Sequence, residues 1–362
     1  MSKMSTITET IPKVIVDDLA KDQFLAQEFE EVENLRKDAK HDNFKPQYVW
    51  RNIALFAALH FDDNFKPQYV WRNIALFAAL HFGALIGLYQ LFFVAKWLTV
   101  GWTLMCWLIS GLGITAGAHR LWSHKSYKAT KPLQIFLMLC QTMAFQNDVI
   151  EWSRDHRCHH KWTDTDADPH NVNRGFFFSH VGWLLQKKHP KIKEMGKKLD
   201  LSDLERDPVL AFQRKYYLPL VLIVCFLFPT AFAVYGWGES ALVAFYTAAL
   251  WRYCWTLHAT WFINSAAHTF GYKPYDANIT PVESIWTTIT AFGEGGHNYH
   301  HTFPQDYRTS EMPMLLNLTK AFIDFFAAIG WVYDRKSVAE EIIKRQKARA
   351  GDLTLLKSQK SQ

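Results

Sequence analysis

Long apolar segments, each followed by a polar turn or a charged stretch, dominate the pattern of the chain. They cover residues 74–95, 98–118, 217–237 and 241–263. Each is long enough to cross a bilayer, because a hydrocarbon core about 30 Å thick needs about 20 helical residues. Arg252 and His258 interrupt the last segment, so part of that helix should face protein rather than lipid. The pattern predicts an all-α integral membrane protein with four transmembrane helices.

Mixed, charged sequence follows the second and fourth segments, at 119–216 and 264–335. Within it, residues 133–145 are apolar but too short to span, so a buried or membrane-surface helix is expected there. The loops inside the two pairs of segments hold one basic residue, Lys96, and the positive-inside rule places such loops on the lumenal side. The charged stretches should therefore form a helical cap on the cytosolic side, and both chain ends should be cytosolic.

One sequence of twenty residues, DNFKPQYVWRNIALFAALHF, occurs twice, at 42–61 and 63–82. Perfect identity in a chain without other repeats indicates a recent duplication or an assembly error rather than a solenoid. Only the second copy continues into an apolar segment of spanning length. We therefore expect residues 1–62 to be a tail with a redundant first copy, 63–335 the membrane domain and 336–362 a C-terminal tail.

The amino-acid composition limits the classes of partner that the protein could bind. The 362 residues carry a net charge of +6 and 15% aromatic residues. This charge is modest for the length and does not support nucleic-acid binding, so the basic residues should meet anionic lipid or an anionic substrate. The five cysteines form no CxxC pair, which indicates neither a disulfide framework nor a thiolate metal site.

Histidines gather in three boxes just outside apolar segments. Two boxes share the spacing i, i+3, i+4: His156, His159 and His160, and again His297, His300 and His301. These positions share one helix face, so the three imidazoles of a box should converge on one point. The third box, His119 and His124, has a five-residue gap that a regular helix does not align, so the helix should bend or end there. His268 is a ninth histidine, at the end of the fourth segment.

Nine neutral imidazoles exceed what one ion takes, which predicts a site for two metal ions. Imidazole suits zinc, copper, iron and nickel. A structural zinc site would close with four ligands that usually include cysteine, so iron, which can activate dioxygen, is the better candidate. Carboxylates should fix the imidazole tautomers, and the candidates are Asp164, Asp166, Asp168 and Glu294.

Five stretches carry a resemblance to a known family: GITAGAHRLWSH (113–124), QNDVIEWSRDHRCHHKWTDTDADPHN (146–171), RGFFFSHVGWLL (174–185), NSAAH (264–268) and GEGGHNYHHTFP (293–304). Over roughly 70–335, the chain resembles the animal acyl-CoA Δ9 desaturases, or stearoyl-CoA desaturases. Related membrane di-iron hydroxylases share histidine boxes but not the sequence motifs that flank them here. The repeat departs from the family pattern, because the family-like region starts at the second copy.

The resemblance implies a di-iron enzyme of the endoplasmic reticulum membrane, with four transmembrane helices and a cytosolic cap. It implies oxygen-dependent insertion of a cis double bond at C9–C10 of a saturated acyl-CoA, with electrons from cytochrome b5 and its reductase. The chain does not contain the haem-binding motif HPGG of a fused cytochrome b5 domain. The implied ligands are a water held by Asn264 and the nine histidines 119, 124, 156, 159, 160, 268, 297, 300 and 301, whereas His170, His180 and His258 match non-ligand positions.

Substrate contacts also follow from the resemblance. A C–H bond in the middle of an alkyl chain has no acidic proton, so a metal–oxygen oxidant must be positioned to within one methylene, for which a bent, closed tunnel is suited. The bend matches Gln146, Trp152 and Thr260. The positions that match the anionic CoA end are Asn73, Asn147, Arg154, Asp155, Lys187, Lys188 and Trp261. For the two lysines, a solvated surface pair is the competing interpretation.

The closed end of the tunnel matches Trp107 and Gly111, four residues apart on one helix face. Gly111 should leave room for a long acyl tail and Trp107 should close the tunnel, which predicts a preference for eighteen carbons. The alternative is that Gly111 only permits close helix packing.

Two other classes of function stay open from the residues alone. One is a membrane hydroxylase, or a desaturase of another lipid class, which product analysis would distinguish. The other is a metal transporter or lipid-binding protein without enzymatic activity. A transporter usually buries ionisable groups at the bilayer midplane, whereas these boxes lie at the ends of spans.

Overall fold

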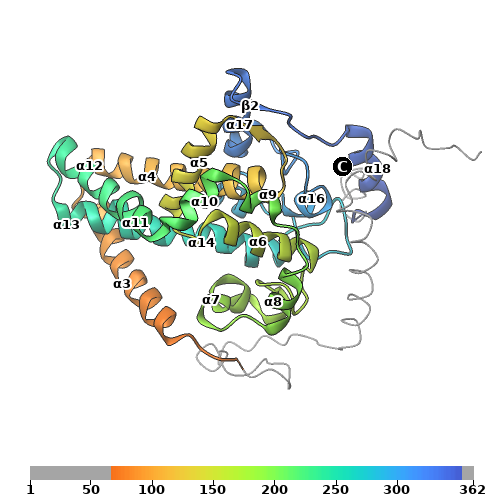
Figure 1. The fold of residues 1–362 in the computed structure, drawn as a ribbon, viewed down its shortest axis with the longest axis horizontal. Helices are drawn as coiled ribbons and strands as arrows, with labels where there is room; N and C mark the ends of the chain where they lie inside the picture. Colours follow the sequence, from red (N-terminus) through yellow and green to blue (C-terminus); the bar gives the residue numbers. More distant parts are fainter. Residues whose placement is uncertain (1–66, 353–362) are drawn as a thin grey trace, which may run out of the picture. The chain divides into compact units, whose positions relative to one another are not determined.

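The computed structural model of the protein describes residues 67–352, which are mostly helical (Figure 1). The predicted N-terminal tail, with the first copy of the repeat, lies outside these residues. The second copy enters the described part and starts its first long helix, α3 (Trp71–Phe93).

Three continuous helices in the described part are long and apolar enough to cross a membrane. The first is α3. The second joins α4 (Trp97–Leu112) to the π-helix η3 (Gly113–Ser123), and the third joins α11 (Tyr217–Val221), η6 (Leu222–Leu227) and α12 (Phe228–Trp237). They coincide with the first three predicted spans.

The fourth predicted span is also one continuous helical segment, composed of α13 (Ala241–Ala244), η7 (Phe245–Trp251) and α14 (Arg252–Ser265). It is not among the three helices that meet the length and hydropathy of a span. The Arg252 side chain faces protein, as predicted: its guanidinium donates to the carbonyl oxygens of Met143 and Cys225, each at 2.7 Å, and is fully buried. A buried cation needs such partners, because an unpaired one is costly to desolvate.

The two loops predicted to be lumenal contact each other. Glu239, in the loop before α13, accepts a hydrogen bond from the backbone N–H of Lys96 at 2.9 Å. The Lys96 ammonium donates to the carbonyl oxygen of Gly238 at 2.6 Å. Both loops therefore lie at the same end of the helices, as a shared side of the membrane requires.

The rest of the described residues consists of short helices, two short strands and the segments that connect them. Between the second and third long helices lie α5 (Lys131–Ala144), α6 (Val149–Lys161), η4 (Val172–Arg174), η5 (Phe178–Gly182), α7 (Trp183–Leu185), α8 (Pro190–Gly196), α9 (Ser202–Glu205) and α10 (Pro208–Lys215). After α14 come η8 (Ala266–His268), α15 (Ile285–Thr290), α16 (His297–Thr302), η9 (Met314–Leu316), α17 (Leu318–Ala328) and α18 (Glu340–Ala350). Strands β1 (Lys128–Ala129) and β2 (Val332–Tyr333) pair antiparallel, with Lys128 opposite Tyr333.

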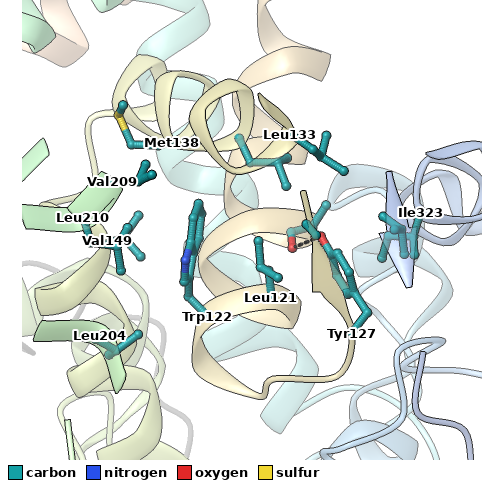
Figure 2. Packing of buried hydrophobic residues seen from close by; sticks show 14 of the residues in the cluster. Leu121, Trp122, Tyr127, Leu133, Met138, Val149, Leu204, Val209, Leu210 and Ile323 are labelled. Atoms are coloured by element: carbon teal, nitrogen blue, oxygen red, sulfur yellow. Dashed lines mark hydrogen bonds between the residues drawn. The ribbon is translucent and has the colours of Figure 1, made fainter. Parts of the chain in front are cut away.

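A hydrophobic core packs around the end of η3, the helix that carries the first histidine box. Figure 2 shows Trp122 of η3 among side chains from α5, α6 and α10, with Leu133 and Leu210 fully buried. The Tyr127 hydroxyl donates to the Ala116 carbonyl at 2.7 Å and ties the segment after η3 back to it. Helix α5 agrees with the expected buried helix, since one face lies in this core while Ile135 and Phe136 are exposed.

The described part of the predicted C-terminal tail is folded. Ile343 of α18 is buried with Tyr275, Tyr299 and Phe303, and Lys347 pairs with Glu311 at 2.6 Å. Tyr299 and Phe303 lie on or next to α16, the helix that carries the last histidine box. The residues beyond 335 therefore support the region of that box.

Deleting residues 42–62 is expected to leave membrane insertion and enzymatic activity essentially unchanged. The second copy and the apolar residues that follow it form α3 without the first copy, and they include Asn73, whose amide donates to the Leu184 carbonyl at 2.8 Å. Membrane fractionation and product analysis of the deletion variant would check this. An equally long deletion of 71–91, inside α3, is the control that should abolish insertion; loss of insertion or activity in the 42–62 variant would contradict the prediction.

Candidate metal centre

The structure brings all nine predicted histidines together, in two adjacent clusters. His119, His124, His156, His160 and His300 form the first cluster, and His159, His268, His297 and His301 form the second. Within each cluster, one ring nitrogen from every residue lies within 4.8 Å of the others. Each cluster can hold one metal ion, which agrees with the predicted pair.

The spacing of the nitrogens fits a coordination sphere. In the first cluster the Nε2 atoms of His124 and His156 are 2.8 Å apart, and those of His160 and His300 are 2.9 Å apart. In the second, the Nε2 atoms of His297 and His301 are 3.2 Å apart. Two imidazole nitrogens at about 2.0–2.1 Å from one ion and at right angles to each other are about 2.9 Å apart.

A buried nitrogen without a partner points to the same conclusion. Nε2 of His159 is buried and has no hydrogen-bond partner among the described residues, while its Nδ1 contacts Asp168 at 2.9 Å. Buried polar atoms are nearly always satisfied. The free nitrogen belongs to the second cluster, where a metal ion would satisfy it.

Each repeated box divides between the two clusters, so the expectation of one point per box is wrong. On α6, His156 and His160 join the first cluster and His159 joins the second. On α16 the assignment is reversed: the i and i+4 residues join the second cluster and His300, at i+3, joins the first. Positions i+3 and i+4 lie on either side of position i on a helix, so one box reaches two neighbouring centres.

The first box agrees with its prediction that the helix bends or ends there, because η3 ends at Ser123 and His124 is its C-cap residue. The helix widens into the π-helix η3, and the backbone N–H of His124 donates to the His119 carbonyl at 3.1 Å, five residues back. A π-turn aligns residues i and i+5. The two rings therefore share one face, with centroids 4.9 Å apart.

Glu294 orients the first cluster. Its carboxylate accepts from Nδ1 of His119 at 3.0 Å and from the Arg120 guanidinium at 2.7 Å. Burial alone would raise the pKa of Glu294, but Arg120 and His119 outweigh it and hold the pKa below its usual value. The carboxylate therefore stays charged and keeps the proton of His119 on Nδ1, which turns Nε2 toward the cluster.

Asp168 and Asp164 orient the second cluster. Asp168 accepts from Nδ1 of His159, and its other contacts are the backbone N–H groups of Asp164 and His170. Nδ1 of His268 contacts the Thr280 hydroxyl at 3.1 Å, and that hydroxyl donates to Asp164. Three of the four predicted carboxylates thus support the rings directly or through one hydroxyl.

The fourth predicted carboxylate lies elsewhere. Asp166 pairs with Lys191 of α8 at 3.0 Å on the surface. Its position in the turn after α6 directs it outward, while Asp164 and Asp168 on either side face the rings. The prediction for Asp166 is therefore wrong.

The protonation states of most of these imidazoles favour metal binding. Burial, followed by repulsion from neighbouring rings or cations, holds the pKa well below its usual value for seven imidazoles: His124, His156, His160, His268, His297, His300 and His301. These rings are neutral at physiological pH, as metal ligands must be. Burial also acts to lower the pKa of His159, but the Asp168 carboxylate outweighs it and the pKa is raised.

The residues predicted for the tunnel bend meet beside the first cluster. The Gln146 amide donates to the Thr260 hydroxyl at 2.9 Å and its oxygen accepts from the Trp152 indole at 3.4 Å. The Trp152 ring stacks on His156 at a centroid distance of 4.9 Å. A polar anchor thus lies next to a metal-ligating group.

A small cavity of about 20 Å³ lies between Thr260 of the bend and the predicted closed end. Its lining is mostly apolar and consists of Trp107, Gly111, Ile114, Thr115, Thr256, Ala259, Thr260, Ala291 and Phe292. The space over Gly111 is filled rather than open: a Cβ atom added there would lie 1.9 Å from the Phe292 ring. That ring also packs on Trp107 at a centroid distance of 4.6 Å.

Sequence reasoning missed Phe292, because a single phenylalanine before the last histidine box carries no signal of its own. Its backbone is left-handed, with φ of +57°, and the next residue, Gly293, has φ of +107°. A left-handed conformation is rare for a bulky residue and is kept only where its surroundings hold it. This turn directs the Phe292 ring toward α4.

Two of the three predicted head-group cations, Arg154 and Lys188, are already paired. Arg154 and Lys188 both contact Asp155, Arg154 at 2.8 Å, and Arg154 also contacts Glu151 at 3.2 Å. Lys187 is exposed at the surface. An anionic ligand would therefore compete with two carboxylates for Arg154 and Lys188.

The other predicted head-group residues are spread over neighbouring elements. Asn147 has a left-handed backbone, with φ of +66°, and its carbonyl accepts from Gln141. Trp261 of α14 is buried against Phe77 of α3, with centroids 5.6 Å apart. Asn264, which was predicted to hold a metal-bound water rather than the head group, lies one turn before His268, at the end of α14.

Comparison with known proteins agrees with the geometry. The family model described as fatty acid desaturase matches residues 95–334. The chain belongs to the fatty acid desaturase family. It is 67% identical over 348 residues to a Delta(9)-fatty-acid desaturase of Caenorhabditis elegans, covering 96% of each protein. It is 49% identical over 347 residues to the stearoyl-CoA desaturase of Homo sapiens, covering 95% of this chain and 89% of that protein. For the acyl-CoA Delta-9 desaturase of Acheta domesticus the identity is 55% over 310 residues, covering 85% of this chain and 80% of that protein.

Proposed function

We propose that this desaturase acts on saturated long-chain acyl-CoA, stearoyl-CoA above all, and inserts a cis double bond between C9 and C10. The observation that carries the proposal is the contact of Gln146, Trp152 and Thr260 beside the first histidine cluster. Similarity to proteins named as acyl-CoA and stearoyl-CoA desaturases supports the class of substrate.

The nine histidines would hold two iron ions, with Asn264 holding a water at the second. Bound iron would supply the oxidising chemistry: two hydrogen atoms leave the acyl tail while dioxygen is reduced to two waters, with two further electrons and two protons. Glu294, Asp168 and the Thr280–Asp164 pair contact Nδ1 of His119, His159 and His268, and would thereby leave Nε2 of each ring to bind an ion.

The remaining residues position the substrate. The hydrogen-bonded group at Gln146 gives the tunnel a fixed bend, so that one pair of methylenes stays beside the first cluster. The apolar cavity beyond it takes the methyl end. Asn73, Asn147, Arg154, Asp155, Lys187, Lys188 and Trp261 would contact the CoA end, with Arg154 and Lys188 exchanging carboxylate partners for phosphate.

The protein would act in the endoplasmic reticulum membrane, with four spans and with the cap and both ends in the cytosol. The less apolar fourth helix, from Ala241 to Ser265, would be the fourth span, and the hydrogen bonds of Arg252 to carbonyl oxygens inside the protein support this assignment. Electrons would come from cytochrome b5 and its reductase, which would dock on the cytosolic side.

Expression in a desaturase-deficient host tests this function. We expect growth without added unsaturated fatty acid, and cis-9 monounsaturated C18 and C16 acids in the lipids. Hydroxylated products, or a double bond at another position, would contradict the proposal. Retention of metal without any oxygen-dependent product would favour a non-enzymatic metal protein.

A further inference from the structure

A separate group of metal-ligating side chains lies between α3 and α14. His81 is near the middle of α3 and His258 is on α14, and their Nε2 atoms are 3.0 Å apart. Cys254, one turn before His258, is buried and carries a free thiol. One ligand atom from each of the three residues lies within 4.8 Å of the other two.

A series of hydrogen bonds runs through these rings, and acceptors fix both of its ends. At one end Nδ1 of His81 lies 2.6 Å from the Phe77 carbonyl oxygen. A carbonyl only accepts, so this Nδ1 carries a proton.

At the other end Nδ1 of His180 lies 2.9 Å from the Ser265 hydroxyl. That hydroxyl donates its one proton to the Trp261 carbonyl at 2.9 Å. Nδ1 of His180 therefore has to donate as well.

Between these ends, the three neutral rings have one N–H group too few to supply a donor at both ring–ring contacts. Nε2 of His180 and Nδ1 of His258 are 3.0 Å apart, as are Nε2 of His258 and Nε2 of His81. Three neutral imidazoles carry three N–H groups, and two are used at the ends. The third serves only one of the two contacts, so at the other contact two lone pairs face each other. The arrangement needs one cation.

We propose that this cation is a thiophilic transition-metal ion, Zn²⁺ in the first instance, bound by His81, His258 and Cys254. With the ion at the two Nε2 atoms, Nδ1 of His258 donates to His180, and every contact in the series has one donor. Of the two ring contacts, the ion should occupy the one between His258 and His81, because the Cys254 thiol lies beside these two rings. Thiolate combined with imidazole suits zinc and copper(I), and the thiol releases its proton when the ion binds.

The site is distinct from the two histidine clusters in chemistry. The clusters contain only imidazole, whereas this group contains sulfur. An ion here joins α3 to α14, the helix that continues into η8 and His268. It would therefore brace the helix that presents one ligand of the second cluster, without touching that cluster.

Cobalt(II) added to the purified, iron-loaded full-length protein in detergent tests the site. A thiolate–cobalt charge-transfer band is expected, because Cys254 is the cysteine that lies with two histidines in the described part. The band should saturate at one cobalt per protein molecule and disappear when zinc is added. Cobalt that replaces iron in the all-histidine clusters gives no such band, so the result does not depend on the desaturase function.

The variants make the assignment specific. Cys254→Ser and His81→Gln should each abolish the band, while Cys140→Ser, at a buried cysteine of α5, should keep it. Unchanged iron content in all three variants confirms that they fold. Absence of the band in the wild-type protein would overturn the proposal; the cation would then be a proton shared between the rings. A band that persists in Cys254→Ser would overturn the ligand assignment.

Discussion

His160→Ala is expected to abolish desaturation. His160 belongs to the first cluster, with its Nε2 atom 2.9 Å from that of His300. Loss of an outer-sphere partner typically costs about 10–100-fold in metal affinity or activity, so loss of a ligand should lower turnover by more than about 100-fold. The measurement is the rate of oleoyl-CoA formation from stearoyl-CoA by purified enzyme, together with its iron content.

His189→Ala is the matched control, because His189 lies at the start of α8 and belongs to neither cluster. It should keep wild-type iron and turnover. Wild-type turnover in the folded His160→Ala variant would show that the ligand assignment is wrong. A matching loss in the control would show that the purification, rather than the ligand, limits activity.

Gly111→Ile is expected to shift the substrate preference from eighteen carbons toward sixteen and fourteen, while the double bond stays at C9. A side chain at Gly111 meets the Phe292 ring at once, and we expect the displaced ring to narrow the adjoining cavity, which both residues line and which we propose takes the methyl end. One methylene in an apolar pocket is worth about 1–3 kcal/mol, or about 10–200-fold in discrimination. The bend at Gln146 and Thr260 is unchanged, so the position of the double bond should not move.

Product profiles with C14, C16 and C18 acyl-CoA measure this shift. Gly101→Ile is the control on the same helix, because a side chain at Gly101 meets nothing within 4 Å. Phe292→Ala in the Gly111→Ile background should restore use of C18, since it removes the ring that the new side chain displaces. An unchanged profile in an active Gly111→Ile enzyme would place the tunnel end elsewhere and leave Gly111 with a packing role only.

The sequence by itself determined the features that depend on local order. Apolar length predicted the three long helices, since spanning a bilayer requires uninterrupted apolar residues. The interruption by Arg252 correctly predicted a helix that faces protein. The three boxes and His268 identified all nine histidines, because several imidazoles at helical spacing beside membrane segments are hard to explain except by a shared metal.

The tertiary structure decided how these pieces combine. Spacing along α6 and α16 could place three rings on one face, but the division between two clusters depends on how the helices face each other. The π-helix η3 aligned His119 with His124, against the rule for a regular helix. Asp166 and Asp164 are equivalent in sequence, yet only the fold turned one toward the rings and the other toward Lys191.

The sequence did not predict the roles of residues whose contacts are with residues distant along the chain. Phe292 fills the space over Gly111 from a loop 181 residues away, in a left-handed conformation held by its surroundings. His81 and Cys254 are single residues within apolar segments, where a buried packing role is the ordinary expectation. Their meeting with His258 exists only because α3 packs against α14, and a pattern read along one helix contains no information about that contact.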